Sequence, residues 1–257
     1  MPSLTSITDH LADLLEVDDF RDYAPNGLQV PGRSEVQTVV TGVSADVQLL
    51  ERAAAEGADL VVVHHGLFWR GDPQEITPLL HRRLRILFAH DIALAAYHLP
   101  LDAHPEHGNN ALLAAGLGAV QPTPFAEHGG RPIGLRVRLP GDGLTLAELA
   151  ARVAEAVGGR PPLAIDGGGG APERIRTLGI VSGAATDDVH EAIALGLDAF
   201  LTGEPAERAF GIARDAGIHF LAAGHHATET FGVRRLGALL EERFGVRHVF
   251  VDTENPI

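Results

Sequence analysis

The sequence predicts an α/β protein made of two similar α/β lobes with largely parallel sheets and a metal site in the cleft between them. Short apolar runs alternate with segments of helical periodicity, which is typical of parallel strands flanked by helices. A faint internal repeat supports two lobes: residues 41–60 and 181–199 each contain a small-residue strand end, a helix and a Gly-x-Asp turn. Histidines also stand where several of the predicted strands end.

Composition limits the classes of function. The chain has 257 residues, 45% of them hydrophobic, which is enough for one large domain or two lobes with a sizeable core. Acidic residues outnumber basic ones by 34 to 20, so duplex nucleic acid is not an expected partner. The absence of cysteine excludes disulfides, thiolate nucleophiles and sulfur-ligated metals. Neither a signal peptide pattern nor a membrane-spanning run is found, so we expect a cytoplasmic protein without membrane contact.

The first lobe is expected to cover residues 1–125. It opens with an amphipathic helix over 3–16, for which Ser3 is a candidate N-cap. Pro25 and the Asn26-Gly27 pair then predict a shaped loop over 23–30. The remaining pattern predicts strands over 36–43, 59–63 and 92–97 and helices over 45–56, 78–90 and 109–117.

The second lobe is expected to cover residues 126–257, and a proline-containing segment over 121–132 is expected to contain the boundary between the lobes. Its pattern predicts strands over 133–139, 175–181, 198–201, 218–222 and 246–251 and helices over 145–157, 187–195, 205–216 and 227–244. The glycine run over 167–170 lacks the Gly-Lys-Ser/Thr of a phosphate loop. We therefore assign no residues to an organic cofactor.

Candidate metal ligands follow three of the predicted strands. They are His64 and His65, His98 and Asp102, and His225 and Glu229. Ligands of parallel α/β sheets gather at the carboxyl ends of strands, so these side chains are placed for chemistry. His225 and Glu229 are four residues apart at a helix start, which puts both on one helix face. Three of these histidines with the two carboxylates suit two divalent ions of the zinc, iron or manganese type.

The remaining histidines are interpreted individually. His98 could ligate a metal, orient Asp102 or donate to a substrate. His226 stands one residue off the chelating face, and we take His98 and His226 as candidate catalytic acids or bases. His104 and His107 are expected to line the mouth of the site. The histidines to which we assign no role are His10, His81, His90, His128, His190 and His248.

Five segments of the chain form motifs with a specific order and spacing. They read Pro-Asn-Gly-Leu-Gln-Val (25–30), Val-His-His-Gly (63–66), His-Leu-Pro-Leu-Asp-Ala-His-Pro (98–105), Thr-Gly-Glu (202–204) and Ala-Gly-His-His-Ala-Thr-Glu (223–229). In these motifs the chain resembles the YbgI-type dinuclear-metal family, whose members are known as GTP cyclohydrolase I type 2 homologues. The resemblance covers the chain from about residue 23 to its end and is to the short form of the family.

The resemblance implies a two-lobed α/β fold, a di-metal site in a cleft and a ring-shaped homohexamer. It implies that the two divalent ions are held by five ligands, namely His64, His65, Asp102, His225 and Glu229. Two positions depart from the pattern of many relatives, which have proline at Gly66 and tyrosine at His226. These departures leave the ligands unchanged and concern the substrate.

The leading hypothesis is a metal-dependent hydrolase of a small-molecule substrate, a nucleotide or related heterocycle. In the GTP cyclohydrolase-like version, a metal-bound hydroxide adds to C8 of guanine and formate is released, with His98 or His226 moving protons. One alternative is a non-enzymatic, hexameric metal-binding or regulatory assembly, which needs no proton transfer. Another is a di-metal phosphoesterase, which releases phosphate instead of formate.

Overall fold

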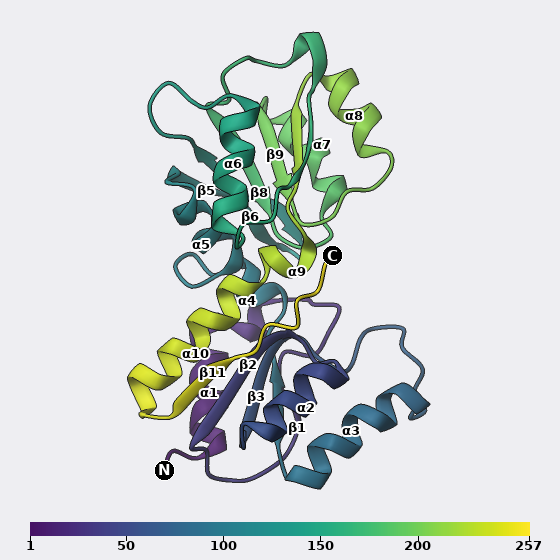
Figure 1. Cartoon of the computed structure of the whole chain (residues 1–257), viewed down its shortest axis with the longest axis vertical. Coiled ribbons are helices and arrows are strands. Elements are labelled where there is room, and N and C mark those ends of the chain that lie inside the picture. Colours follow the sequence, from purple (N-terminus) through teal and green to yellow (C-terminus); the bar gives the residue numbers. More distant parts are fainter. The chain divides into compact units, whose positions relative to one another are not determined.

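The chain folds into two compact units (Figure 1). A computed structural model describes residues 1–257. Unit 1 consists of residues 1–101 and 232–254, and unit 2 consists of residues 102–231 and 255–257. This division differs from the predicted one between residues 125 and 126, because the last long helix and the last strand of the chain belong to unit 1.

Unit 1 is built on a five-stranded sheet with the order β1-β4-β3-β2-β11. The strands are β1 (Gly27–Val30), β2 (Thr38–Ser44), β3 (Leu60–His65), β4 (Ala93–Ala96) and β11 (Arg247–Phe250). β4, β3, β2 and β11 are parallel neighbours, whereas β1 is antiparallel to β4. The loop predicted over 23–30 therefore continues into an edge strand, where Leu28 pairs with Ala95.

Helices cover both faces of this sheet. They are α1 (Leu4–Leu15) and α10 (Thr230–Phe244) on one face and α2 (Val47–Ala55) and α3 (Pro78–His90) on the other. Alternate residues of β3 serve the two faces: Leu60 and Val62 pack toward α1 and α10, while Val61 and Val63 pack toward α2 and α3. Each fully buried side chain of this size contributes about 1.5–3 kcal/mol. The predicted Ser3 cap is confirmed, since its side chain accepts from the Ser6 N–H at 3.1 Å.

Unit 2 is built on a six-stranded sheet with the order β5-β6-β8-β9-β10-β7. The strands are β5 (Val120–His128), β6 (Arg131–Arg138), β7 (Leu163–Ile165), β8 (Thr177–Val181), β9 (Ala199–Thr202) and β10 (His219–Ala222). Only β8, β9 and β10 are parallel neighbours; β5, β6 and β7 join antiparallel. The predicted α/β class with two sheets is confirmed, and the sheets are parallel in part.

The helices of unit 2 include several short ones. They are α5 (Asn109–Gly116), α6 (Leu146–Ala156), α7 (Val189–Ala194), α8 (Ala209–Ala216) and α9 (His225–Thr228), with 3-10 turns η2 (Gly168–Gly170) and η3 (Thr186–Asp188). In unit 1, the 3-10 turn η1 (Val17–Asp19) follows α1, and the short α4 (Leu99–Ala103) follows β4 and contains the passage to unit 2. No helix of the structure has both the length and the apolar character that a bilayer span requires.

The segment over 121–132, predicted as a lobe boundary, instead forms β5 and the start of β6. Pro122 and Pro124 suggested a linker, but β5 is at the edge of its sheet. A proline at an edge strand removes no ladder hydrogen bond when its missing N–H would face solvent. The prolines therefore mark an edge strand inside unit 2.

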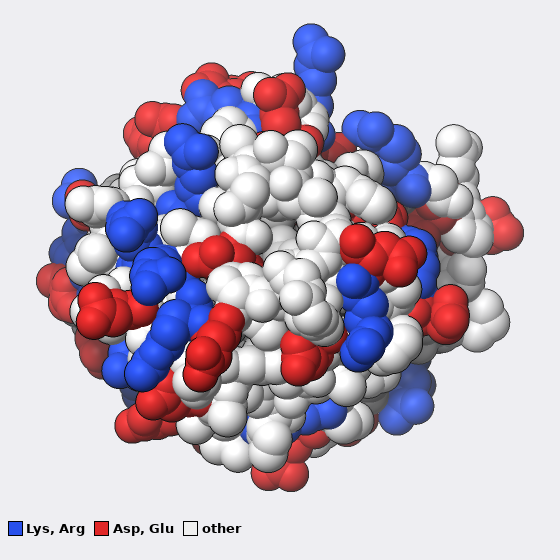
Figure 2. Space-filling model, turned by 90° about the horizontal axis from the view of Figure 1, so that it is seen from above, with Lys and Arg blue, Asp and Glu red and all other residues white.

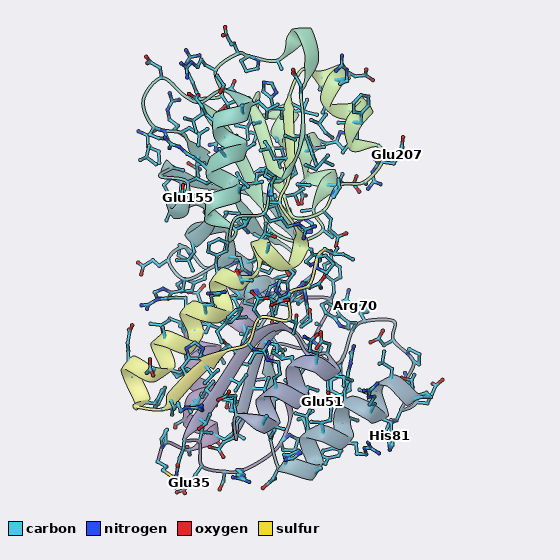
Figure 3. All side chains as sticks on the ribbon, viewed as in Figure 1. Glu35, Glu51, Arg70, His81, Glu155 and Glu207 are labelled. Atoms are coloured by element: carbon cyan, nitrogen blue, oxygen red, sulfur yellow. The ribbon has the colours of Figure 1, made fainter.

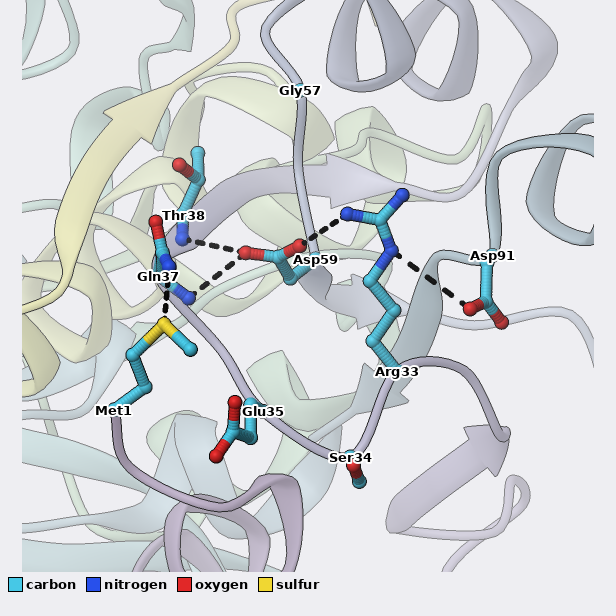
Figure 4. A pocket seen from close by; sticks show the side chains of 9 residues that line it. All are labelled: Met1, Arg33, Ser34, Glu35, Gln37, Thr38, Gly57, Asp59 and Asp91. Atoms are coloured by element: carbon cyan, nitrogen blue, oxygen red, sulfur yellow. Dashed lines mark hydrogen bonds and ion pairs between the residues drawn. The ribbon is translucent and has the colours of Figure 1, made fainter.

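The internal repeat corresponds to a shared structural device at the starts of parallel strands. Asp59 precedes β3 and accepts from the backbone N–H groups of Gln37 and Thr38 at 2.8 and 3.1 Å (Figure 4). In unit 2, Asp198 precedes β9 and accepts from the N–H groups of Arg176 and Thr177, both at 2.8 Å. Each carboxylate thus ties the start of one strand to the start of its parallel neighbour.

Candidate metal centre

His64 and His65 end β3, the central strand of unit 1. They lie within the strand, not just beyond it as predicted, and their ring centroids are 4.7 Å apart. The Nδ1 atom of His64 lies 2.9 Å from the carbonyl oxygen of Tyr97, and that of His65 lies 3.0 Å from the Ser44 hydroxyl. A carbonyl oxygen can only accept, so His64 carries its proton on Nδ1. When neutral, a ring with its proton on Nδ1 has Nε2 as its ligand atom, an arrangement typical of metal-binding histidines.

His98 follows β4 and is held by a carboxylate that the sequence analysis did not single out. Its Nδ1 lies 2.7 Å from Oδ1 of Asp22, whose side chain is 3% exposed. The other oxygen of Asp22 accepts from the Leu99 N–H and from the Asn26 side chain, both at 2.9 Å. Burial alone would raise the pKa of Asp22, but these hydrogen bonds and the nearby imidazole lower that pKa to about 2.

Unit 1 therefore assembles three imidazoles at the carboxyl ends of neighbouring strands. Ligand nitrogens of His64, His65 and His98 all lie within 4.8 Å of one another. The ring of Trp69 contacts two of the three, with centroid distances of 5.6 Å to His65 and 5.1 Å to His98. A group of histidine nitrogens at this spacing could hold a divalent ion of the zinc or iron type.

Asp102 is the first residue of unit 2 and is buried, with 5% of its surface exposed. Its Oδ1 accepts from the Asn109 side chain and from the Ser182 hydroxyl, both at 2.8 Å. Asn109 begins α5 and Ser182 follows β8, so two separate elements fix the orientation of this carboxylate. A carboxylate oriented in this way is prepared for ligation.

His225 and Glu229 lie at the start and just past the end of α9, the short helix after β10. Their Nε2 and Oε1 atoms are 3.1 Å apart, so the predicted shared face is confirmed. Glu229 is 2% exposed, and a carboxylate oxygen of Glu229 lies within 4.8 Å of one of Asp102. Unit 2 therefore brings together two carboxylates and one imidazole, a set of hard and borderline ligands.

Glu204 orients His225 from the opposite side. Its Oε1 lies 2.5 Å from Nδ1 of His225, which directs Nε2 toward Glu229. Burial opposes the charged form of His225, but the hydrogen bonds and charges of Glu229 and Glu204 outweigh it and raise the pKa to about 9. Gly183 leaves room for this pair, because a Cβ there would lie 2.5 Å from Oε1 of Glu229.

The other predicted histidines take different positions. His226 is buried in α9, and its backbone N–H donates to the carbonyl of Ile257 at 2.8 Å. Nδ1 of His104 accepts from the N–H groups of Glu106 and His107, and the rings of His104 and His107 stack at 4.7 Å. The structure thus gives His104 a role in shaping the turn before α5.

Two residues that orient the candidate ligands were not predicted from the sequence. Asp22 stands just before the first motif, and its local sequence Arg-Asp-Tyr carries no ligand spacing. Glu204 is part of the Thr-Gly-Glu motif. When the internal repeat is extended from Asp59 and Asp198, Glu204 falls opposite His65, and this was the available signal. Asn26 was predicted as part of a turn, yet its Oδ1 also accepts from the His98 N–H at 2.7 Å.

Comparison with known proteins places the chain in a family. The model of the family described as Duf34/NIF3 (NGG1p interacting factor 3) matches residues 2–256. The chain belongs to the Duf34/NIF3 family. A relative from Pseudomonas aeruginosa, called a GTP cyclohydrolase 1 type 2 homolog, is 43% identical over 254 residues, covering 99% of this chain and 98% of the relative. One of the same name from Escherichia coli is 43% identical over 241 residues, covering 91% and 92%. The predicted family is confirmed.

Solved structures agree with this Duf34/NIF3 assignment. The structure titled protein ybgI, of unknown function, superposes with a TM-score of 0.93 at 40% identity and covers all of both chains. A Thermus thermophilus protein gives a TM-score of 0.89 at 36% identity, again over all of both chains. Reduced HcgD from Methanocaldococcus jannaschii gives 0.84 at 20% identity and covers 98% of each chain, which supports the fold alone.

Proposed function

We propose that this Duf34/NIF3 protein binds two divalent metal ions through His64, His65, Asp102, His225 and Glu229 and acts as a metal-dependent hydrolase. The observation that carries the proposal is that hydrogen bonds within the protein already orient the ligand side chains. Nδ1 of His64 faces the carbonyl of Tyr97, Nδ1 of His225 faces Glu204, and Asp102 receives two hydrogen bonds. These partners fix which atoms are available for ligation. The donor set of nitrogen and oxygen suits ions such as zinc, iron or manganese.

Several of the proposed ligands lie close in sequence to the passages of the chain between the units. The chain passes from unit 1 to unit 2 between Leu101 and Asp102, and it returns between Phe231 and Gly232. Asp102 and Glu229 therefore lie next to the two passages, and His98 lies four residues before the first.

In the proposed reaction, the metal ions and the protein side chains have different roles. Bound divalent ions supply Lewis acidity and lower the pKa of water at the site. His98, fixed through Nδ1 by Asp22, can accept or donate a proton at Nε2, and His226 is a second candidate for this role. Asp22 holds the ring in one orientation.

The substrate class we propose is a nucleotide or related heterocycle, as the name of the relatives suggests. The protein is acidic overall, with a net charge of −14. Figure 2 shows acidic and basic side chains interspersed on one face, without a continuous basic surface for a nucleic-acid backbone. A small anionic substrate therefore fits this protein better than a duplex.

We also propose a homohexamer, following the resemblance of the chain to YbgI-type proteins. Large apolar side chains exposed on and near α3, namely Ile76, Leu79 and Phe88, support contacts between copies. Light scattering on the purified protein measures this directly: a mass of six chains agrees with the proposal, and a monomer contradicts it.

Metal analysis of purified protein tests the proposal first. We expect about two divalent ions per chain in protein handled without chelators. Glu229→Gln and His65→Asn should each lose metal. Glu207→Gln and His81→Asn are matched controls, because both residues are exposed on their units (Figure 3). Well under one ion per chain in the wild type would contradict the dinuclear centre.

A product assay on the same metal-loaded sample tests the hydrolase. Release of formate from GTP supports the cyclohydrolase-like reaction, whereas release of phosphate supports a phosphoesterase. Two ions per chain without turnover of any nucleotide would favour the non-enzymatic metal-binding assembly. His98→Asn should abolish turnover under the hydrolase proposal and leave the properties of a non-catalytic assembly intact.

A further inference from the structure

A cavity of about 760 Å³ opens in unit 1 beside the three imidazoles. It is lined by residues of two segments, 17–26 and 68–70, which come from the turn after α1 and from the loop after β3. Its volume is within the range of about 300–1,000 Å³ that is usual for small-molecule sites. Nothing in the proposed ligand set uses this cavity.

Three residues that line the cavity also contact the imidazole group. Trp69 lines it and also contacts the rings of His65 and His98. Asp22 and Asn26 line it as well, and both bind His98. A molecule in this cavity would therefore lie against the residues that position the candidate catalytic group.

Aromatic side chains form much of the lining. Phe68 and Trp69 are partly exposed, and Tyr23 is 48% exposed. Flat π faces accessible from a polar cavity favour planar aromatic ligands, because stacking on such a face contributes about 1–3 kcal/mol per ring. Aliphatic side chains are few here, so the lining fits a flat ring better than an alkyl chain.

Two arginines give the cavity its available positive charge. The guanidinium of Arg70 donates to the backbone oxygen of Asp22 at 2.8 Å, and its backbone N–H donates to Tyr23 at 2.7 Å, so the residue is positioned without an ion pair (Figure 3). Arg21 also lines the cavity, and its side chain is exposed. Of the two acids that line it, Asp22 is satisfied by His98, Asn26 and Leu99, and Asp18 is exposed.

We propose that this cavity binds a planar heteroaromatic ring that carries an anionic group, with the ring against Trp69 and the anion at Arg21 and Arg70. The proposal rests on the proposed function, because it places the reacting ring beside His98. It adds a binding site that consists of residues outside the metal ligand set. Both nucleotides and aromatic carboxylates share this chemistry.

Trp69 provides the readout, because it is the only tryptophan of the chain. The probes are GMP, guanosine, ribose 5-phosphate and nicotinate, each titrated into metal-loaded and into chelator-treated protein while tryptophan fluorescence is recorded. We expect saturable quenching by GMP in both samples, at least ten-fold weaker binding of guanosine, and no quenching by ribose 5-phosphate. Binding of nicotinate but not GMP would keep the ring-and-anion site and assign it to an aromatic carboxylate.

Variants that retain Trp69 locate the anion. Arg70→Gln and Arg21→Gln should each weaken GMP binding about ten-fold, since each removes a charge-assisted hydrogen bond. Arg85→Gln removes the same charge from the exposed face of α3 and should have no effect. If Arg70→Gln fails to fold, Arg70→Lys retains the charge and should retain part of the affinity.

The outcomes separate this inference from the proposed function. Absence of saturable quenching by both GMP and nicotinate overturns the cavity proposal, as do Arg21 and Arg70 variants that bind like Arg85→Gln. Formate or phosphate release without quenching overturns the cavity proposal and leaves the hydrolase standing. Arginine-dependent quenching in a protein that holds metal but turns over no nucleotide supports the cavity and contradicts nucleotide hydrolysis.

Discussion

Asp22 and His98 form a partly buried pair in unit 1, with 2.7 Å between the carboxylate Oδ1 and the imidazole Nδ1. The pair joins the turn after α1 to the end of β4, two segments that are 76 residues apart in the sequence. A carboxylate behind an imidazole fixes both the tautomer and the ring orientation. Asp22 is therefore a positioning residue for whatever His98 does.

Asp22→Asn should lower turnover about 10–100-fold, because an amide would not hold the imidazole in the same tautomer and orientation as the carboxylate does. Steady-state rates and metal content, measured on the same preparation, check this. We expect metal content to stay close to that of the wild type, since Asp22 contacts none of the five proposed ligands. Asp187→Asn is the control: this exposed carboxylate pairs only with Arg208 on the surface. Equal turnover in both variants would contradict a positioning role.

Gly183→Ala should displace the carboxylate of Glu229 and reduce metal binding. Its Cβ would lie 2.5 Å from Oε1 of Glu229 and 3.3 Å from Nε2 of His225. Gly196→Ala is a matched control, because its φ of +67° is close to the +69° of Gly183 while its Cβ would meet nothing within 4 Å. Both variants should lose about 1–2 kcal/mol of stability from the left-handed backbone. Only Gly183→Ala should also lose metal, measured by elemental analysis.

Metal binding should release a proton from His225. In the metal-free protein its pKa is raised to about 9, so the ring is protonated at neutral pH, and a ligating ring must be neutral. Metal affinity should therefore fall as pH drops below about 9, by up to about ten-fold per pH unit. A raised pKa also means that His225 stabilises the metal-free fold below the ordinary pKa of 6.5 and loses this effect as pH rises through about 9.

Glu204→Gln tests the origin of this dependence. Removing one of the two carboxylates should lower the pKa of His225 toward 6.5 and flatten the pH dependence of metal affinity between about pH 7 and 9. Calorimetric titration in two buffers of different ionisation enthalpy measures the released proton. Glu207→Gln, three residues away and exposed, serves as the control. An unchanged proton release in Glu204→Gln would contradict the assignment.

Asp198→Ala should destabilise unit 2 by about 1–3 kcal/mol, because three donors of Arg176 and Thr177 lose their shared acceptor. Asp59→Ala should have a similar effect on unit 1. Denaturant unfolding followed by circular dichroism measures both. Asp215→Ala, which removes an exposed carboxylate from α8, should change stability much less. Equal stability of all three variants would show that the strand starts need no such acceptor.

The sequence predicts single elements of this fold well where periodicity and end signals agree. The helix predicted over 78–90 is present as Pro78–His90, with Thr77 as the cap before its first-turn proline. The periodicity of apolar residues does not show which sheet a strand joins. The strand predicted over 246–251 is real, but it pairs with β2 of unit 1 through Val249 and Val40, which only the folded chain determines.

In the candidate site too, some residues could be predicted from the sequence and others could not. The residue types and spacing at strand ends identified His64, His65, His98, Asp102, His225 and Glu229. Asp22 could not be found in this way, because a carboxylate that orients an imidazole has no fixed sequence distance from it. Glu204 could have been found, since the internal repeat aligned it with His65 at the end of the corresponding strand.

The return of α10 and β11 to unit 1 has a consequence for how the protein is made. Residues 102–231 are inserted within the sequence of unit 1, and β11 completes one edge of its sheet. During synthesis the whole of this insertion leaves the ribosome before β11 does. Until β11 has been synthesised, β2 remains an unpaired edge strand, although unit 2 can already fold. The exposed N–H and C=O groups of such an edge can pair with another chain. The synthesis of unit 1 begins before that of unit 2, but the folding of unit 1 is completed later.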